Sequence, residues 1–510
     1  MIAVCAVVVA QVAAHSPQGS QLGTVHFPTS AAPEVQPSIE RGVALLHSFQ
    51  YLEAAQAFDD AARRDTSCAV CHWGQAMALY HQLWDWPNAE TIERGRREVA
   101  EAQRVGVPTP RERGYLAAAA AFFNPPIAVS QASRLRAYSR AMASLHRQFA
   151  DDGEATAFYA LSLIALANAN IDSDANRRRA IDLLTPLFQR QPNHPGAAHY
   201  LIHATDRPGL ARFGVEAAKM YADIAPDSSH ALHMPSHIFV RLGMWPETVQ
   251  TNLRAAAAGK QAALEGRGDY TYQVHALDYV QYAYLQLGKS DLARAVVDEF
   301  DDVPTASEKE KASDRAYAAA RAALEEHRWA DAASLPIPSM DVSWFQEAYL
   351  ARLIGAARIG DAHAARANWI KYYESTRESH RTTLNVEQLE ANAWVAYAER
   401  DTNRAINSLR RAARLEAGQG GDEIAMPARE MLADMLLELR RPADALQAYR
   451  LVLRSAPNRF DALLGAARAA DARHLTRDAR RYYRELLRVA APDADRSELQ
   501  VAREYLAKFD

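Results

Sequence analysis

The sequence predicts an all-α protein, built as a solenoid of antiparallel helix pairs. Of its 510 residues, 49% are hydrophobic, which is enough for a large core. The 22 glycines and 23 prolines fall mostly between segments with helical periodicity. Small and aromatic residues also recur at an offset of 34 residues. This offset is typical of stacked two-helix repeats.

The N-terminal segment predicts export. Residues 1–14 are apolar and end in Val12-Ala13-Ala14, which is typical of a secretory signal and its cleavage site. The segment is atypical because the chain has no Lys or Arg before Arg41. We expect a signal peptide over 1–14, a linker over 15–37 and a periplasmic or secreted protein. If residues 1–14 are not a signal, a cytoplasmic protein is expected. No later apolar run reaches the roughly 18 residues of a membrane span.

Repeat-like patterns are clearest at the two ends of the chain. Near the N-terminus, Phe58 follows a small-residue helix pattern and Trp73-Gly74 begins the next helix. Near the C-terminus, Ala445 and Tyr449 are matched 34 residues later by Ala479 and Tyr483. The small residue lets two helices approach closely, and the aromatic ring fills the groove beside it.

Turn residues divide the middle of the chain. Gly243, Gly288 and Gly360 each follow a helical pattern and are expected to end a helix. The charged segment 301–312 marks a division near residue 304. We therefore expect an N-terminal helical array over 38–304 and a C-terminal array over 305–510.

These patterns resemble the tetratricopeptide repeat family, most strongly over 38–82 and 424–490. Two segments, residues 41–49 (RGVALLHSF) and 233–238 (HMPSHI), also resemble a bacterial subgroup of such proteins. The resemblance implies antiparallel helix pairs stacked into a right-handed superhelix with a concave inner face. It implies no reaction, because the subgroup has no firmly assigned activity.

Net charge makes a nucleic-acid partner unexpected. The chain has 58 basic and 62 acidic residues and a formal charge of −4, whereas proteins that bind nucleic acids usually carry a strong basic surface. A protein or peptide partner is expected instead. We also find no phosphate-binding glycine loop, GxSxG motif or dinucleotide-binding fingerprint.

A histidine pair that recurs one repeat later is the strongest chemical signal. His199 and His203 are four residues apart, and His233 and His237 repeat this spacing at an offset of 34. Positions i and i+4 share a helix face, and equivalent positions of neighbouring repeats stack. We therefore expect the four imidazoles to converge on the inner surface.

Three further side chains extend this histidine set. His230 shares the helical spacing of the second pair, unless Pro235 starts a new helix and leaves His230 and His233 in a preceding turn. His275 and Asp278 lie on the next expected inner helix, at about 270–287. The metal-ligand candidates are thus His199, His203, His230, His233, His237, His275 and Asp278.

The histidine set allows three interpretations. Three imidazoles with an open position suit catalytic zinc, and mixed imidazole and carboxylate ligands suit iron, copper or manganese. Asp206 or Asp278 is then a ligand, an acceptor for an imidazole N–H or a general base. The same side chains also suit a polar ligand-binding surface, or plain packing in the groove between helices.

Residues 68–72 (CAVCH) match the CxxCH pattern of haem c attachment. In that interpretation Cys68 and Cys71 form thioethers and His72 ligates the iron. The alternatives are packing at the start of a repeat helix or a local redox pair in an oxidising compartment.

An aromatic cluster of Trp73, Tyr80, Trp84 and Trp86 lies near His47 and His81 in the sequence. Repeat core is the favoured interpretation, and the lining of a ligand or peptide groove is the alternative.

Three functions follow in order of preference. The first is an exported scaffold that binds a peptide or partner protein on its concave face. The second is a metal-binding protein or metalloenzyme centred on the histidine set, with a divalent zinc, copper, iron or manganese ion. The third is a c-type haem protein. The sequence identifies no catalytic residue and leaves open whether the protein is an enzyme.

Overall fold

The computed structural model describes residues 21–376, 385–419 and 424–509. All regular secondary structure in these ranges is helical, which confirms the all-α prediction. The predicted signal peptide lies outside the described residues. Within the described residues, we find no helix with the length and apolarity needed to cross a bilayer.

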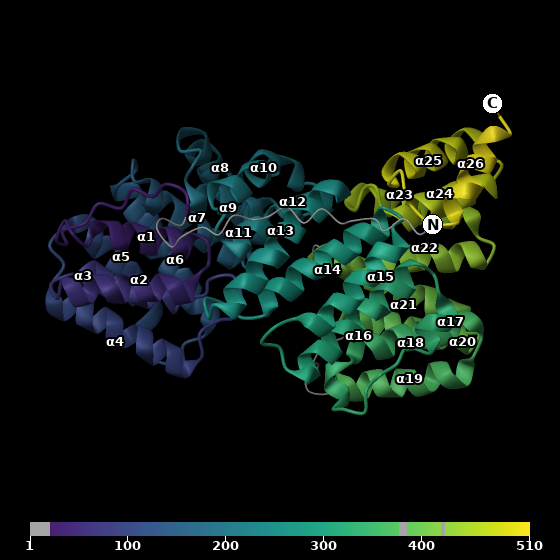
Figure 1. Ribbon diagram of the computed structural model, residues 1–510, viewed down its shortest axis with the longest axis horizontal. Coiled ribbons are helices and arrows are strands. Elements are labelled where there is room, and N and C mark those ends of the chain that lie inside the picture. Colours follow the sequence, from purple (N-terminus) through teal and green to yellow (C-terminus); the bar gives the residue numbers. More distant parts are fainter. Residues whose placement is uncertain (1–20, 377–384, 420–423, 510) are drawn as a thin grey trace, which may run out of the picture.

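The first third of the chain forms compact helical hairpins at one end of the molecule (Figure 1). Its helices are α1 (Gln36–His47), α2 (Tyr51–Arg64), α3 (Ala69–Ala78), α4 (Ala89–Val105), α5 (Pro110–Phe123), α6 (Gln131–Gln148), α7 (Gly153–Asn168) and α8 (Ser173–Arg190).

The middle of the chain is less regular and contains several short helices. They are α9 (Pro195–Thr205), η1 (Ala211–Phe213), α10 (Val215–Ile224), α11 (Ser229–His233), α12 (Pro235–Leu242), α13 (Trp245–Leu264), α14 (Thr271–Gln286), α15 (Ser290–Glu299) and η2 (Phe300–Asp302).

The last part returns to regular hairpins. Its helices are α16 (Glu308–Glu325), α17 (Trp329–Ala333), η3 (Val342–Trp344), α18 (Gln346–Ile359), α19 (Ala362–Ser375), α20 (Val386–Ala398), α21 (Thr402–Gln419), α22 (Ala428–Glu438), α23 (Pro442–Ser455), α24 (Phe460–Asp471), α25 (Thr476–Val489) and α26 (Glu498–Ala507).

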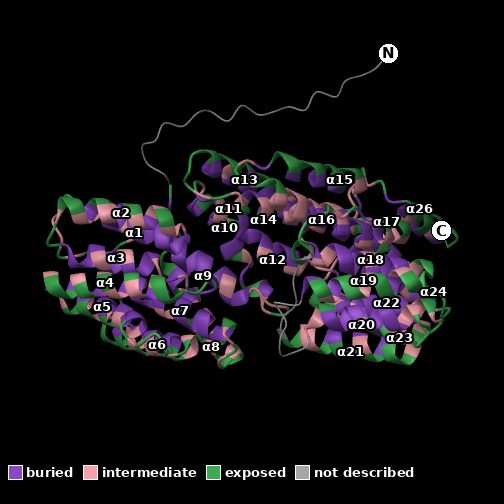
Figure 2. Ribbon diagram, turned by 90° about the horizontal axis from the view of Figure 1, so that it is seen from below, coloured by how far each residue is buried: buried purple, intermediate pink, exposed green. Residues whose placement is uncertain are grey.

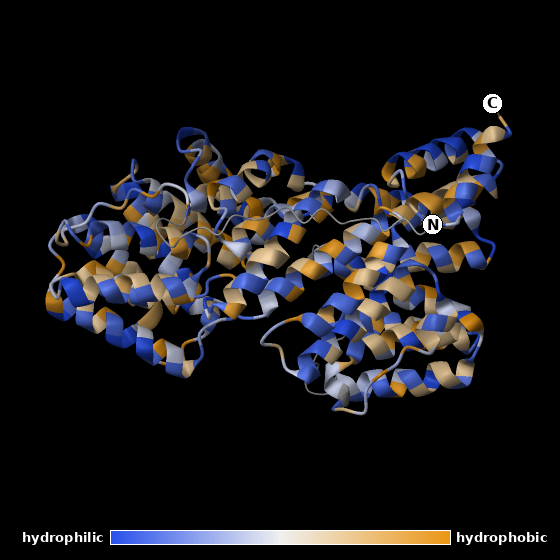
Figure 3. Ribbon diagram, in the orientation of Figure 1, coloured by the Kyte–Doolittle hydropathy of each residue, from blue (hydrophilic) through white to orange (hydrophobic). Residues whose placement is uncertain are grey.

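The packing order is that of a helical repeat scaffold. Most helices pack against the next helix along the chain, and alternate helices also touch, as in the series α14, α16, α18 and α20. Outer helices such as α2 and α25 bury one side and leave the other in water, whereas inner helices such as α7 and α9 are buried on nearly all sides (Figure 2). Hydrophilic residues accordingly cover the outer helix faces (Figure 3).

One packing device recurs at the two ends of the chain. In α2 and α3, the ring of Phe58 lies against Gly74, where an added Cβ would come within 2.3 Å of the ring. In α23 and α24, Tyr449 lies against Gly465, where an added Cβ would come within 2.2 Å. Each aromatic residue precedes its glycine by 16 positions (58 to 74, and 449 to 465). The two contacts are therefore equivalent, and they explain the repeat signal.

Residues 21–35 contain no helix, yet they pack against the helices. Leu22 and Phe27 are buried, and the Phe27 ring stacks on Trp73 with centroids 5.2 Å apart. The backbone N–H of Thr24 donates to Asn193 O at 2.8 Å. This part of the predicted linker is therefore fixed to the body of the protein.

The C-terminal helices turn back onto the middle of the chain. The indole N–H of Trp245 donates to Asn458 O at 2.9 Å, and the N–H of Ala491 donates to Leu287 O at 2.9 Å. Arg459, which immediately precedes α24, is fully buried against Glu325 and Glu430 at 2.9 and 2.7 Å. The solenoid is thus closed by contacts between segments about 200 residues apart.

Buried residues form two large clusters joined by smaller ones. One extends from Leu22 to Phe239, and the other from Ala316 to Tyr505. A smaller cluster includes residues on both sides of position 304, from Ala222 to Ala318. The division near 304 stays a prediction.

Candidate metal centre

The helices that carry the histidines are fixed by local capping. Pro195 occupies the first turn of α9, and the His194 side chain accepts a hydrogen bond from Ala197 N at 3.1 Å. Ser228 caps α11 by accepting from Ala231 N at 3.2 Å, and Pro235 starts α12. The sequence alternative in which Pro235 separates His233 from His237 is therefore the one observed.

Six of the seven ligand candidates gather into two groups. The first histidine group is His199, His203 and His230, and its ligand atoms lie within 4.8 Å of one another. The second histidine group is His233, His237 and His275, whose ligand atoms also lie within 4.8 Å of one another. The two groups adjoin, since the rings of His203 and His237 have centroids 6.3 Å apart.

In the first histidine group, a backbone carbonyl orients the central imidazole. His199 Nδ1 lies 2.6 Å from His47 O, which can only accept, so Nδ1 carries the hydrogen. The Nε2 lone pair of neutral His199 then faces His230 Nε2 at 3.1 Å. His203 Nε2 is buried and has no hydrogen-bond partner among the described residues.

In the second histidine group, two side chains orient the imidazoles. His233 Nδ1 donates to Asn252 Oδ1 at 2.7 Å, and the Asn252 amide donates to Thr248 O, which fixes its orientation. His237 Nδ1 lies 3.2 Å from Asp206 Oδ2. Both Nδ1 atoms therefore carry the hydrogen. Both Nε2 atoms are then lone-pair donors, and they lie 3.1 Å apart.

Two lone pairs at this distance repel unless a cation lies between them. A proton in this position is disfavoured, because burial lowers the pKa of His199 to about 3. Burial, together with the neighbouring imidazoles, also lowers the pKa values of His203, His230 and His233 well below the ordinary value of histidine. A metal ion satisfies the arrangement. Imidazoles that bind metals usually donate the other ring N–H to a carbonyl or carboxylate, as His199 and His237 do here.

Aromatic rings surround the two groups. Phe49 contacts His199, with centroids 4.4 Å apart, and Tyr279 contacts His233 at 4.7 Å. Trp84 lies 5.7 Å from His203 and is 48% exposed. His275 is also exposed, so solvent reaches the second group directly.

A third cluster is held together mainly by its own polar contacts. The Glu154 group consists of His47, Glu154 and His194, all buried. His47 Nε2 donates to Glu154 Oε2 at 2.6 Å, and its Nδ1 accepts from the Tyr200 hydroxyl at 2.9 Å. His194 Nδ1 is occupied by its helix cap, so Nε2 carries the hydrogen. His194 Nε2 lies 3.2 Å from Glu154 Oε1, within ion-pair distance but without a hydrogen bond among the described residues. Both ring nitrogens nearest the carboxylate thus carry hydrogens rather than lone pairs.

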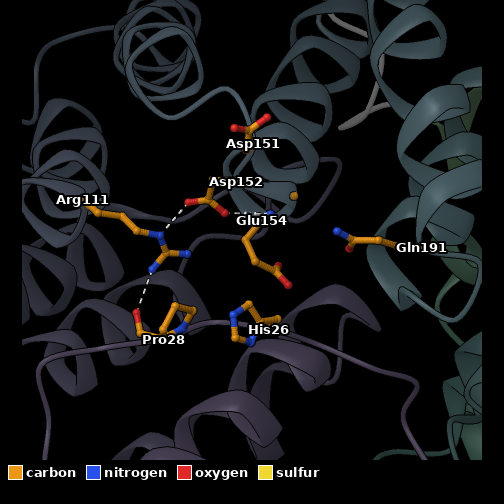
Figure 4. Close-up of a pocket in the computed structure, with 8 residues that line it drawn as sticks. His26, Pro28, Arg111, Asp151, Asp152, Glu154 and Gln191 are labelled. Atoms are coloured by element: carbon orange, nitrogen blue, oxygen red, sulfur yellow. Dashed lines mark hydrogen bonds and ion pairs between the residues drawn. The ribbon is translucent and has the colours of Figure 1, made fainter.

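A small pocket of about 140 Å³ opens onto the Glu154 group. Its lining includes Arg111, Asp152 and Gln191 (Figure 4). Burial alone raises the pKa of Glu154, and the two imidazoles more than reverse this effect, so the pKa falls below its ordinary value. Arg111 is paired with Asp152 at 2.7 Å. The pocket thus ends on a hydrogen-bonded ion cluster, distinct from the two histidine groups.

The prediction for Asp278 is corrected by the structure. Its Oδ1 accepts from Arg321 Nη2 at 2.8 Å, and it does not join either histidine group. Arg321 lies 43 residues later in the chain, and no local sequence pattern predicts its contact with Asp278. The residues missed by the sequence analysis are Asn252, Glu154 and His194.

The haem prediction for Cys68, Cys71 and His72 is also not supported. Cys68 and Cys71 are joined by a disulfide, which leaves no thiol to form thioethers. The two cysteine residues are also buried, with 2% and 0% of their surface exposed. His72 lies against Glu98 at 2.9 Å. The local redox-pair alternative fits this geometry.

The aromatic cluster divides between core and surface. Trp73 and Tyr80 are buried, as predicted for repeat core. Trp84 and Trp86 are 48% and 44% exposed, so the core interpretation is wrong for these two.

Comparisons with known proteins leave the family unassigned. No family model matches the chain, and no curated protein matches its sequence. Among solved structures, a human IFIT1 dimer with m7Gppp-AAAA is 13% identical, with a TM-score of 0.36 over 83% of this chain and 90% of that one. The same protein with PPP-AAAA is 12% identical, with a TM-score of 0.33 over 88% and 89%. The P58(IPK) TPR domain is 11% identical, with a TM-score of 0.21 over 93% and 99%.

Proposed function

We propose that the protein binds two transition-metal ions, one in each histidine group. The observation that carries the proposal is the pair of Nε2 atoms of His233 and His237, which lie 3.1 Å apart. Acceptor oxygens of Asn252 and Asp206 lie beside the opposite ring nitrogens, at 2.7 and 3.2 Å. Tri-imidazole sites leave coordination positions open for a substrate, which is typical of catalytic rather than structural sites. Zinc, copper, iron and manganese are the candidate ions.

Elemental analysis of protein purified without a histidine tag tests the proposal. We expect about two ions per chain after metal-replete growth, since each group offers three imidazoles. His203→Ala and His237→Ala should each lose about one ion, and the double variant both. His363→Ala is the control, because His363 is exposed on α19. Unchanged metal content in a folded double variant would overturn the proposal.

A second function, binding of a peptide or partner protein, is favoured by Trp84 and Trp86. Large exposed aromatic side chains often serve as anchors for partners. Capture of a partner that is lost with Trp86→Ala, but kept in the double histidine variant, would support this function independently of metal.

Export to the periplasm or outside the cell is part of the proposal. The apolar segment 1–14 supports it, and so does the disulfide between Cys68 and Cys71, since such bonds persist in oxidising compartments. Cell fractionation with a disulfide-trapping label tests it, and reduced cysteines in a cytoplasmic fraction would contradict it.

A further inference from the structure

We infer that the two histidine groups form a paired copper centre that reacts with dioxygen. The inference rests on the proposed function and adds the metal and the class of substrate. Four features carry it: the charge of the ligands, the closeness of the groups, the chemistry of the walls and the access from solvent.

The first feature is the absence of negative charge among the ligands. Six neutral imidazoles supply the ligand atoms of the two groups. The nearby carboxylate of Asp206 is engaged by His237 Nδ1 and by Arg241 at 3.0 Å, and Asp278 is engaged by Arg321. Two adjacent divalent ions would therefore carry four positive charges without a bridging carboxylate.

Of the candidate metals, copper gives the smallest electrostatic repulsion between the two bound ions. Repulsion between two ions scales with the product of their charges, so two monovalent ions repel one quarter as strongly as two divalent ions at the same distance. Among the candidate metals, copper alone is stable as a monovalent ion, and three imidazoles suffice for its trigonal coordination. Imidazole also ranks high among copper ligands.

The second feature is the closeness of the groups. The rings of His203 and His237 belong to different groups and have centroids 6.3 Å apart. The two groups therefore share a boundary. The inference places one ion on each side of it, near enough for one small molecule to contact both.

The third feature is the apolar character of the walls. Phe49, Trp84 and Tyr279 line the centre. Arg241 and Arg321 pair with Asp206 and Asp278, and Arg177 donates to His203 O and to Asn168 Oδ1. A phosphate or carboxylate substrate would need a cation aimed into the site. A small, uncharged molecule such as dioxygen needs none, and the exposed ring of His275 marks the side from which it enters.

The reaction balances with two metal ions and no other redox group. Two Cu(I) ions each lose one electron, dioxygen gains two electrons, and its O–O double bond becomes a single bond. Two protons from solvent then complete hydrogen peroxide. An external reductant of the ascorbate class returns both ions to Cu(I) for another turnover.

Anaerobic loading of metal-free protein with Cu(I) provides the test. We expect about two Cu(I) per chain and, on mixing with dioxygen, about one hydrogen peroxide per two copper ions. His203→Ala and His237→Ala hold one copper each. Because one Cu(I) supplies only one electron, these variants should release superoxide, measured as cytochrome c reduction that superoxide dismutase suppresses. The wild type should release at least tenfold less superoxide per copper. His363→Ala should behave as the wild type.

Two outcomes separate this inference from the proposed function. If the protein binds two zinc ions but fewer than two Cu(I), the two-metal function stands and the copper inference is overturned. If the wild type releases as much superoxide per copper as the single-site variants, the ions act separately, and the paired reaction is overturned. Failure to bind any metal overturns both.

Discussion

Individual hydrogen bonds on the far side of each imidazole decide which ring nitrogen can bind a metal. His199 uses a backbone carbonyl, His233 an amide oxygen and His237 a carboxylate. In the Glu154 group the arrangement is reversed, and the N–H groups face the carboxylate. Clusters with the same residue types therefore have different chemistry.

Asp206 is expected to tune the second histidine group. Asp206→Ala removes the acceptor of His237 Nδ1, so the ring loses its fixed orientation and metal affinity at that group should fall about 10- to 100-fold. Competition titration with a chromogenic chelator measures the change. Asp223→Ala is the control, since Asp223 is exposed on α10. Equal affinities in both variants would show that Asp206 does not orient the ligand.

The sequence predicted this site in part. The 34-residue offset brought His203 and His237 to neighbouring positions, as a repeat requires. It could not predict that His230 joins His199, because the break at Pro235 separates α11 from α12. Nor could it identify Asn252, whose amide oxygen contacts His233 from α13.

At the scale of helix pairs, the contact between one aromatic residue and one glycine sets the spacing of the hairpins. Tyr449 on α23 fills the space that a side chain at Gly465 on α24 would need. Its hydroxyl also donates to Asp434 on α22. The ring cannot move without breaking that hydrogen bond.

Gly465→Ala is therefore expected to destabilise the protein by about 1–3 kcal/mol, the usual cost of overpacking. Urea unfolding measures the loss. Gly418→Ala is the matched control, because Gly418 lies in α21 and an added Cβ meets nothing within 4 Å. That change should stabilise by about 0.5–1 kcal/mol. If Gly465→Ala left the free energy of unfolding unchanged, close packing at this contact would be refuted.

Asp314 on α16 should make stability depend on pH. Burial, with added repulsion from Asp278 and Glu310, raises its pKa to about 7 from an ordinary 3.8. The folded state then keeps a proton that the unfolded state loses, so this contribution to stability falls as pH rises from about 4 to 7.

Asp314→Asn removes that titration. Its urea midpoint relative to wild type should rise between pH 4 and 7 and then stay level, while exposed Asp182→Asn should show no such trend. A constant difference across this range would contradict the raised pKa.

Helix boundaries were predictable where glycine ends a helix. Gly243 and Gly360 follow α12 and α18 with φ values of 64° and 85°, a region that favours glycine. Residues 21–35 were less predictable. Their composition indicates a linker, whereas Phe27 packs on Trp73 through a contact that no local pattern specifies.

At the scale of the whole molecule, Arg459 holds the C-terminal helices to the middle of the chain. Its guanidinium contacts Glu325, Glu430 and the Tyr282 hydroxyl, all buried. Burial works against the charge of Arg459, and the two carboxylates outweigh it, so its pKa is raised. The sequence analysis left open whether the solenoid closes, because no local pattern pairs Arg459 with Glu325.

Arg459→Ala should destabilise the protein by about 3–5 kcal/mol, because it removes the buried cation that pairs with Glu325 and Glu430 and leaves Glu325 with Gln286 as its neutral donor. Chemical unfolding monitored by Trp fluorescence measures the effect, since Trp245 lies at the same junction. Arg454→Ala, on an exposed face of α23, is the control. A loss as small as in the control would mean that the network does not stabilise the junction.

Closure also constrains how such a chain can change in evolution. An open solenoid gains or loses a repeat at the cost of one local interface, because distant units never meet. Here Asn458 forms a hydrogen bond with Gly243, and Asp495 forms one with Ser290, so the positions of these partners depend on all the helices between them in the chain. Duplicating or deleting one helix pair would displace these partners together, so the number of repeats is fixed by the junction rather than free to drift.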